Sequence, residues 1–270
     1  MLRKKKIGFI GGGNMAEAIV KGLLAGGIPP GNITVAEPLE QRKSYLSESY
    51  GVSTTGDNSS AVASNDIVIL AVKPQVCLEA LQALSNKSSR EKLFISIMAG
   101  VPTKTIEAEL SAEARVIRVM PNTPALVLEA AAAISPGTRA TPDDVACALE
   151  IFGQLGTACS VPEKLMDAVT GLSGSGPAYV FAFIEALSDA GVKNGLPRDV
   201  ATRLAAQTVF GSAKMLLETG EHAAVLREKV TSPGGTTIAG MHVLEKEGFH
   251  GTVMTAVDAA TSRSAELGKG

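Results

Sequence analysis

The stretch that decides the fold is Ile7-Gly8-Phe9-Ile10-Gly11-Gly12-Gly13-Asn14-Met15-Ala16. Residues 7–10 predict a short buried strand, and apolar residues recur at helical spacing over residues 16–24. Between them, Gly11-x-Gly13-x-x-Ala16 has the spacing of the strand-to-helix turn in dinucleotide-binding folds: Gly11 permits the turn, and Gly13 lets a pyrophosphate approach the backbone. We expect the phosphates at the helix N-terminus, where free N–H groups and the helix dipole favour an anion. The alternative is an ordinary turn between a strand and a helix.

Length, charge and cysteine content narrow the class of protein. The 270 residues suffice for one large domain or two smaller ones, and a net charge of -2 gives no reason to expect nucleic acid or an acidic membrane as a partner. The apolar segment behind the basic residues 3–6 is too short for an export signal, and no run is long enough to span a membrane. Cys77, Cys147 and Cys159 have neither metal-ligand nor disulfide-framework spacing. We therefore expect a reduced, cytoplasmic protein without a metal site.

Strand-like runs alternate with helical segments through the first half of the chain. The predicted strands are residues 33–36, 67–72, 93–98 and 115–120, with weaker ones at 130–134 and 157–161, and residues 141–155 predict a helix. Alternation of this kind predicts a doubly wound α/β sheet. Three strands close on Lys73-Pro74, Ala99-Gly100 and Pro121-Asn122. Because ligands bind at the carboxyl edge of such sheets, we expect these ends to line the cofactor site, with Lys73 near a phosphate.

The choice between NAD and NADP depends on Glu37, which follows the second predicted strand. An acid at this distance from the glycines accepts a hydrogen bond from the adenosine ribose and repels a 2′-phosphate. Arg42 and Lys43 lie one helical turn further on, and a nearby Arg can accommodate that phosphate. These residues therefore do not decide between NAD and NADP. The other interpretation of Glu37 is a cap of the next helix.

From residue 163 onward the pattern is helical, which predicts a dinucleotide-binding domain over residues 1–162 and an all-helical domain over 163–270. Two helices are expected at 177–193 and 197–219. Residues 178–184 are apolar almost all round, so this helix must be buried on more than one side. We infer a homo-oligomer whose interface lies in this half, with domain swapping as one way to form it.

Two stretches of this half combine small and hydroxyl residues. Residues 172–177 (Leu-Ser-Gly-Ser-Gly-Pro) predict a helix cap at Ser175 or Gly176, which leaves room for a role in an active site as well. Residues 231–238 (Thr-Ser-Pro-Gly-Gly-Thr-Thr-Ile) lead into a helix reaching about residue 247 and predict a nest of free N–H groups suited to a substrate carboxylate. The alternative for the second stretch is again helix capping.

Other catalytic devices are missing from the sequence. His222, His242 and His250 have no metal-ligand spacing, and there is neither a Gly-x-Ser-x-Gly elbow nor a P-loop ending. Hydride transfer from a bound cofactor needs few protein groups, so this paucity is typical of a reductase.

Taken together, these motifs resemble the pyrroline-5-carboxylate reductase family over essentially the whole chain. The segments that carry the resemblance are Gly8-Phe9-Ile10-Gly11-x-Gly13-x-Met15-Ala16, Ala71-Val72-Lys73-Pro74, Arg118-Val119-Met120-Pro121-Asn122-Thr123-Pro124, residues 167–179, and Val230-Thr231-Ser232-Pro233-Gly234-Gly235-Thr236-Thr237. The resemblance implies a dinucleotide-binding domain followed by a helical dimerisation domain, with dimers assembled into larger rings. It also implies reduction of the cyclic imine 1-pyrroline-5-carboxylate to L-proline by NADPH or NADH, the last step of proline biosynthesis.

The resemblance also implies site residues. Those for the cofactor, including the ones reached above, are Ile10, Gly11, Gly12, Gly13, Asn14, Met15, Glu37, Asn58, Ala71, Val72, Lys73, Pro74, Ile97, Met98, Ala99 and Asn122. Those for the substrate are Glu163, Ser175, Ser232, Gly235, Thr236 and Thr237, with Thr237 as the catalytic residue facing the imine nitrogen. Some relatives carry a serine where Glu37 stands, so the family's preference for NADPH is in question here.

Two rival functions differ in what they require. A β-hydroxyacid dehydrogenase would need a general-base lysine in the helical domain, and Lys193, Lys214 and Lys229 are candidates by residue type alone. A dinucleotide-sensing protein would not need the second anion site at residues 231–237. That site therefore favours an enzyme.

Overall fold

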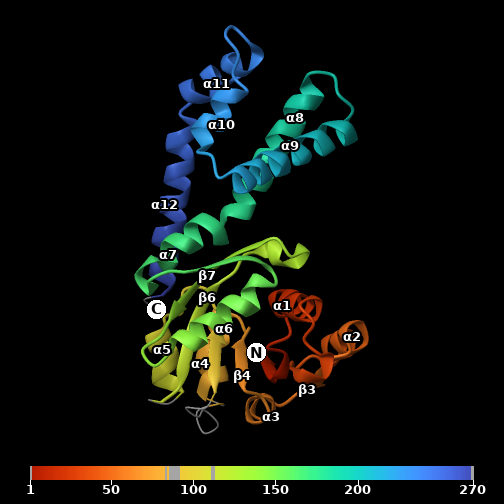
Figure 1. Cartoon of the computed structure of the whole chain (residues 1–270), viewed down its shortest axis with the longest axis vertical. Coiled ribbons are helices and arrows are strands. Elements are labelled where there is room, and N and C mark those ends of the chain that lie inside the picture. Colours follow the sequence, from red (N-terminus) through yellow and green to blue (C-terminus); the bar gives the residue numbers. More distant parts are fainter. Residues whose placement is uncertain (1, 83, 85–91, 111–112, 269–270) are drawn as a thin grey trace. The chain divides into compact units, whose positions relative to one another are not determined.

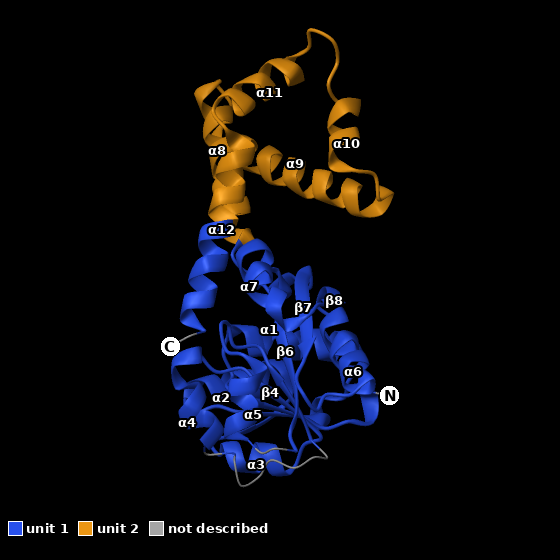
Figure 2. Cartoon of the chain, turned by 90° about the vertical axis from the view of Figure 1, so that its left-hand side faces the viewer, with its two compact units in different colours: residues 1–175, 258–270 blue, residues 176–257 orange. Residues whose placement is uncertain are grey.

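The computed structural model describes residues 2–82, 84, 92–110 and 113–268. The chain forms two compact units, unit 1 with residues 1–175 and 258–270 and unit 2 with residues 176–257 (Figure 2). Residues 163–175, which the sequence assigns to the helical half, group with the sheet. The domain boundary after residue 162 stays a prediction.

Unit 1 is built on an eight-stranded sheet with the order β3-β2-β1-β4-β5-β6-β7-β8. The strands are β1 (Ile7–Ile10), β2 (Ile33–Ala36), β3 (Ser53–Thr55), β4 (Ile67–Leu70), β5 (Leu93–Ser96), β6 (Arg115–Met120), β7 (Ala130–Pro136) and β8 (Gly156–Ser160) (Figure 1). Neighbouring strands are parallel except β6 and β7, which are antiparallel. The order reverses beside β1, the position at which open α/β sheets bind ligands. The predicted doubly wound sheet is confirmed.

Both faces of the sheet are buried, which explains the continuous apolar runs. Phe9 of β1 belongs to one buried cluster with Ile19 and Phe152, whereas its neighbour Ile10 belongs to a second cluster with Leu81. Successive strand residues point to opposite faces, so β1, β2, β4, β5 and β6 each supply both clusters. The helices that supply the rest of unit 1 are α1 (Asn14–Ala25), α2 (Glu40–Tyr50), α3 (Asn58–Ala63), α4 (Cys77–Gln82), α5 (Thr103–Glu109), α6 (Pro142–Gly153) and α7 (Met166–Val169).

Unit 2 is helical, as predicted. It contains α8 (Gly176–Lys193), α9 (Arg198–Thr219), α10 (Ala223–Lys229), α11 (Thr236–Lys246) and the first part of α12 (Phe249–Leu267), whose later residues belong to unit 1. Helix α9 follows Pro197 and ends at Gly220, which adopts the left-handed conformation that favours glycine. On α8, Phe181 is 65% exposed and Val180, Phe183 and Leu187 are also exposed in the single chain. These apolar side chains need a further surface to cover them.

The predicted helix cap at Ser175 or Gly176 is wrong. Residues Thr170–Gly174 form a π-helical turn, and Ser175 keeps a right-handed helical backbone with φ −86°. The Ser175 N–H donates to the Thr170 carbonyl, 2.8 Å away. A cap residue has an extended backbone instead. The chain therefore enters α8 through helical residues and not through a capped start.

Candidate dinucleotide site and substrate nest

The first glycine of the turn after β1 is required by the fold itself. Gly11 has φ +98°, and a Cβ atom there would lie 2.7 Å from the carbonyl oxygen of Ala71, the residue that follows β4. Its N–H donates to the Ala36 carbonyl, 2.8 Å away. Gly11 thus lets β1 end between its two neighbours and turn sharply into α1.

Gly13, in contrast, is not required by the surrounding protein. It precedes α1 with an extended backbone (φ −69°, ψ −177°), and no side chain caps the helix. A Cβ atom at Gly13 would meet nothing within 4 Å. Open space beside the uncapped N–H groups of a helix suits a pyrophosphate, so these residues fit a dinucleotide.

A cavity of about 380 Å³ lies beside Gly13 within unit 1. It is lined by the ends of several strands, as the sequence predicts for a cofactor site. Eight predicted cofactor residues line it: Gly13, Asn14, Met15, Ala71, Val72, Lys73, Ile97 and Asn122.

The other predicted cofactor residues lie outside this cavity lining. Ile10 and Met98 have buried side chains that pack in the core, so only their backbone can face a ligand. Asn58 is the first residue of α3 after the edge strand β3, and Pro74 and Ala99 are exposed next to strand ends. Their contacts with a cofactor stay predictions.

Glu37 lies against the glycine turn. Its Oε2 accepts a hydrogen bond from the Gly12 N–H at 2.9 Å, and its Oε1 accepts one from the Leu39 N–H at 3.1 Å. Helix α2 begins at Glu40, with Leu39 as its N-cap residue and no side-chain cap. Glu37 therefore does not cap this helix, and its carboxylate is positioned by the turn that precedes α1.

Arg42 binds the carbonyl of Gly12, the residue whose N–H donates to Glu37. Its Nε donates to the Gly12 carbonyl at 2.6 Å, its Nη2 donates to Glu17 Oε2 at 2.5 Å, and its guanidinium lies 5.0 Å from the ring centroid of Tyr45. Glu17 Oε1 accepts from the hydroxyls of Tyr45 (2.9 Å) and Tyr50 (2.7 Å). Burial raises the pKa of Glu17, but hydrogen bonds from Tyr50, Arg42 and Tyr45 and the charge of Arg42 outweigh burial, so the pKa is lowered. Glu17 was not predicted as a site residue from the sequence, although an acid in the first turn behind the glycines indicates such a role.

Asn122 joins the end of β6 to the π-helical turn. Its Nδ2 donates to the Ser173 carbonyl at 3.1 Å, and its Oδ1 accepts from the Ala131 N–H at 3.0 Å. The neighbouring Gly174 lines the cavity together with Asn122. Ser175 follows directly and is half-buried, so the predicted substrate residue stands next to the cavity lining.

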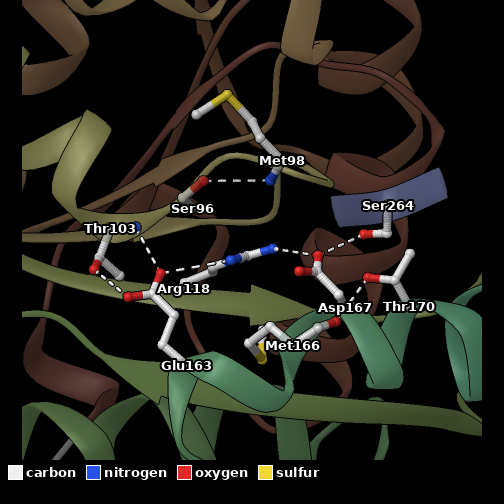
Figure 3. Close-up of polar contacts among 9 residues, drawn as sticks. All are labelled: Ser96, Met98, Thr103, Arg118, Glu163, Met166, Asp167, Thr170 and Ser264. Atoms are coloured by element: carbon white, nitrogen blue, oxygen red, sulfur yellow. Dashed lines mark hydrogen bonds and ion pairs between the residues drawn. The ribbon is translucent and has the colours of Figure 1, made fainter. Parts of the chain in front are cut away.

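A partly buried polar network surrounds Arg118 of β6 (Figure 3). The Arg118 guanidinium lies between two carboxylates, with Nη1 3.5 Å from Glu163 and Nη2 4.0 Å from Asp167. Glu163 also accepts hydrogen bonds from the N–H and the hydroxyl of Thr103, both at 2.7 Å. Ser264 donates to Asp167 at 2.7 Å. Glu163 thus has structural partners, and its contact with substrate stays a prediction.

The predicted carboxylate nest lies in unit 2. Helix α11 begins at Thr236 after Gly235, and no side chain caps it. The first N–H groups of such a helix, including those of Thr236 and Thr237, have no partner within the helix. A Cβ atom at Gly235 would collide with the Ser232 hydroxyl, so this hydroxyl lies directly against the nest. The capping alternative is not realised.

Several of the remaining histidine and lysine candidates have other partners. His222 accepts a hydrogen bond from the Ala224 N–H at the start of α10, and His250 lies 3.0 Å from Glu245. Lys214 and Lys229 pair with Glu218 and Glu221. Over the described residues, no group of three or more His, Cys, Asp or Glu side chains could hold a metal ion, and no described helix has the length and apolar character to cross a membrane.

Comparison with known proteins places these features in one family. The family described as pyrroline-5-carboxylate reductase dimerisation matches residues 163–267, and the family described as NADP oxidoreductase coenzyme F420-dependent matches residues 6–100. A pyrroline-5-carboxylate reductase from Methanosarcina acetivorans is 51% identical over 99% of this chain and 100% of its own length. The structure of a pyrroline-5-carboxylate reductase from Coxiella burnetii superposes with a TM-score of 0.93 at 38% identity, covering 97% of this chain and 98% of that one. A Plasmodium falciparum pyrroline carboxylate reductase with NADP bound gives a TM-score of 0.89 at 34% identity, covering 98% and 99%. The chain belongs to the pyrroline-5-carboxylate reductase family.

Proposed function

We propose that this protein is an NAD(P)H-dependent reductase that converts 1-pyrroline-5-carboxylate to L-proline, the last step of proline biosynthesis. One observation carries the proposal: the chain combines two uncapped helix starts, each suited to an anion. Open space beside Gly13 suits the cofactor pyrophosphate, and the first N–H groups of α11 suit a substrate carboxylate. Family membership over nearly the whole chain supports assigning both to one reaction.

The cofactor residues are those predicted from the sequence, from Ile10 to Met15 along the turn and at the ends of β2, β4, β5 and β6. The bound nicotinamide supplies the hydride. The protein supplies position: Gly13 leaves space for the pyrophosphate, and the small residue Ala71 at a strand end lets a flat ring approach the backbone.

The substrate residues act through hydrogen bonds. Ser232 and the backbone of Gly235 and Thr236 bind the carboxylate, and the Thr237 hydroxyl faces the imine nitrogen. Thr237 is a poor acid, so we assign it to orienting and stabilising that nitrogen, with the proton drawn from the iminium form or from water. Glu163 and Ser175 are the other substrate residues that we propose.

The helical part forms a homodimer, in keeping with the matching dimerisation family and the exposed apolar side chains of α8. We further propose that dimers assemble into a larger ring, that the functional boundary falls after residue 162, and that the protein is cytoplasmic. Sedimentation of the purified protein tests the ring, because a dimer alone would contradict it.

The reaction is tested by absorbance of the reduced nicotinamide. Adding 1-pyrroline-5-carboxylate to enzyme with NADPH or NADH should remove the signal and yield one proline per cofactor oxidised. A stable signal with both cofactors would contradict the proposed function.

A further inference from the structure

Two cations begin helix α2, close to where the sequence places the adenosine ribose, and both are already paired. Arg42 lies 2.5 Å from Glu17, and Lys43 lies 2.6 Å from Glu40. A 2′-phosphate is bound in this type of fold by a nearby Arg, usually through two parallel hydrogen bonds. A 2′-phosphate bound here would therefore compete with Glu17 or Glu40 for these two cations.

The pair of Arg42 and Glu17 is the better anchored. The Glu17 carboxylate receives three hydrogen bonds, from Arg42, Tyr45 and Tyr50, and its side chain is only 17% exposed. Arg42 is fixed a second time by the Gly12 carbonyl. The Lys43 pair, in contrast, involves a Glu40 side chain that is 82% exposed, where an ion pair contributes little.

Glu37 adds a charge on the opposite side of Gly12. Each of its oxygens accepts one hydrogen bond, from Gly12 and from Leu39, whereas an ionised carboxylate offers about four acceptor sites. A ribose 2′-hydroxyl can therefore still donate to Glu37. A 2′-phosphate would meet like charge there, and the Nε and Nη2 donors of Arg42 that could form a bidentate pair already bind Gly12 and Glu17.

We propose that Glu17 is a positioning residue that determines cofactor specificity. By holding Arg42 on Gly12 and away from the ribose, it makes the chain select NAD(H) over NADP(H). The inference rests on the proposed function, since it requires the dinucleotide to bind at the glycine turn. In this proposal, cofactor specificity depends on Glu17 and Arg42, two residues that do not contact the nicotinamide.

Calorimetric titration of the full chain with NAD⁺ and with NADP⁺ tests the proposal through the ratio of the two dissociation constants. The wild type should bind NAD⁺ more tightly. Glu17→Gln removes the charge that holds Arg42, and the ratio should move toward NADP⁺ by roughly tenfold, the size of one charged hydrogen bond. The double variant Glu17→Gln/Arg42→Ala should lose that gain. Tyr50→Phe is the matched control, because it removes one donor to Glu17 and keeps the pair, so its ratio should remain that of the wild type.

Arg42→Ala in the wild-type background tests the proposed role of the Glu17–Arg42 pair even if Glu17→Gln fails to fold. With Arg42 engaged by Glu17, its loss should change both affinities alike and leave the ratio within about twofold. A selective loss of NADP⁺ binding would show that Arg42 already serves the phosphate and would overturn the proposal, as would an unchanged ratio in folded Glu17→Gln. Equal affinities in the wild type would also overturn it while leaving the reductase function intact. If neither NAD⁺ nor NADP⁺ bound, the proposed function itself would be overturned.

Discussion

The guanidinium of Arg118 lies 3.5 Å from the Glu163 carboxylate inside unit 1, and Arg118 is only 5% exposed. A buried guanidinium is tolerated only when it is paired and hydrogen-bonded. Glu163 in turn binds both the N–H and the hydroxyl of Thr103 at the start of α5. Arg118 of β6 thereby fixes Glu163 and the residues that lead from it into α7.

Arg118→Met should destabilise the protein without changing its fold. Breaking a buried pair by removing one partner costs about 3–5 kcal/mol, and the cost here should be nearer 2–3 kcal/mol because the Glu163 side chain is 31% exposed and can be hydrated. Urea unfolding at fixed protein concentration measures the loss. Arg263→Met, which removes an exposed pair with Glu266, is the control and should cost less than about 1 kcal/mol. Equal stabilities of the two variants would contradict a supporting role for Arg118.

Gly13→Val should abolish dinucleotide binding and leave the protein folded. Apart from adjacent residues of the chain, nothing lies within 4 Å of the added Cβ, so the side chain fills the space proposed for the pyrophosphate. Calorimetry with NAD⁺ and NADP⁺ and a thermal melt measure the two effects. Gly31→Val, at an exposed glycine with equal free space, should bind normally. Unchanged affinity in Gly13→Val would remove the turn from the cofactor site.

Replacing Glu37 by Ser should favour NADPH over NADH. The change removes a charge that repels the 2′-phosphate, by roughly 1–2 kcal/mol in the ratio of kcat/KM values. Because Glu37 also accepts the Gly12 N–H, both cofactors should lose some absolute affinity. Glu37→Gln, which keeps an acceptor at this position, separates the two effects. A ratio that does not move in either variant would mean that Glu37 points away from the ribose.

The Thr237 hydroxyl should contribute to turnover and not to folding. Thr237→Val keeps shape and branching, and the lost hydrogen bond should cost about 1.5–3 kcal/mol in the transition state. Turnover should fall roughly tenfold to hundredfold while cofactor affinity is unchanged. Thr237→Ser, which restores the hydroxyl, should recover most of the rate. Normal kcat and KM in the Val variant would transfer the role to another group, with Ser175 the next to test.

Glu17 should contribute to acid sensitivity. Its pKa in the folded protein lies below the ordinary value of 4.5, so its contribution to stability is present above that value and is lost as pH falls through the lowered pKa. Between about pH 6 and about pH 3, the wild type should therefore lose more unfolding free energy than Glu17→Gln, which cannot titrate there. Urea unfolding across this range measures the difference. Parallel curves would show that Glu17 is not held by its three donors.

Much of the fold was predictable because its signals are local. Buried parallel strands leave β-branched runs such as residues 67–70, and glycine and proline mark helix ends such as Gly220. The edge strand β3 and the helices α10 and α12 were not predicted. In particular, Ser53–Thr55 is short and polar and resembles a loop. The reversed direction of β7 was not predicted either, since an alanine-rich run carries no sign of its orientation.

The site was predictable at its contiguous motifs and at the strand ends, which a parallel sheet brings to one edge. The turn from Gly11 to Ala16 and the start of α11 are contiguous motifs, and both have the predicted local form. Glu17 and Arg42 are 25 residues apart and meet only because α1 and α2 pack together. The error at Ser175 has a related cause: glycine and proline spacing predicts a cap, but hydrogen bonds of the π-helical turn keep the backbone helical.

The membership of residues 258–270 in unit 1 has a consequence for synthesis of the chain. Asp167 receives its hydrogen bond from Ser264, and these residues are 97 positions apart. While the polypeptide leaves the ribosome, the sheet and its helices can form first, but this unit is completed only after the last helix has emerged. A fragment that stops after residue 175 would lack Ser264, the hydrogen-bond donor to Asp167 of α7. The dinucleotide-binding part is therefore best produced and studied as the full-length polypeptide.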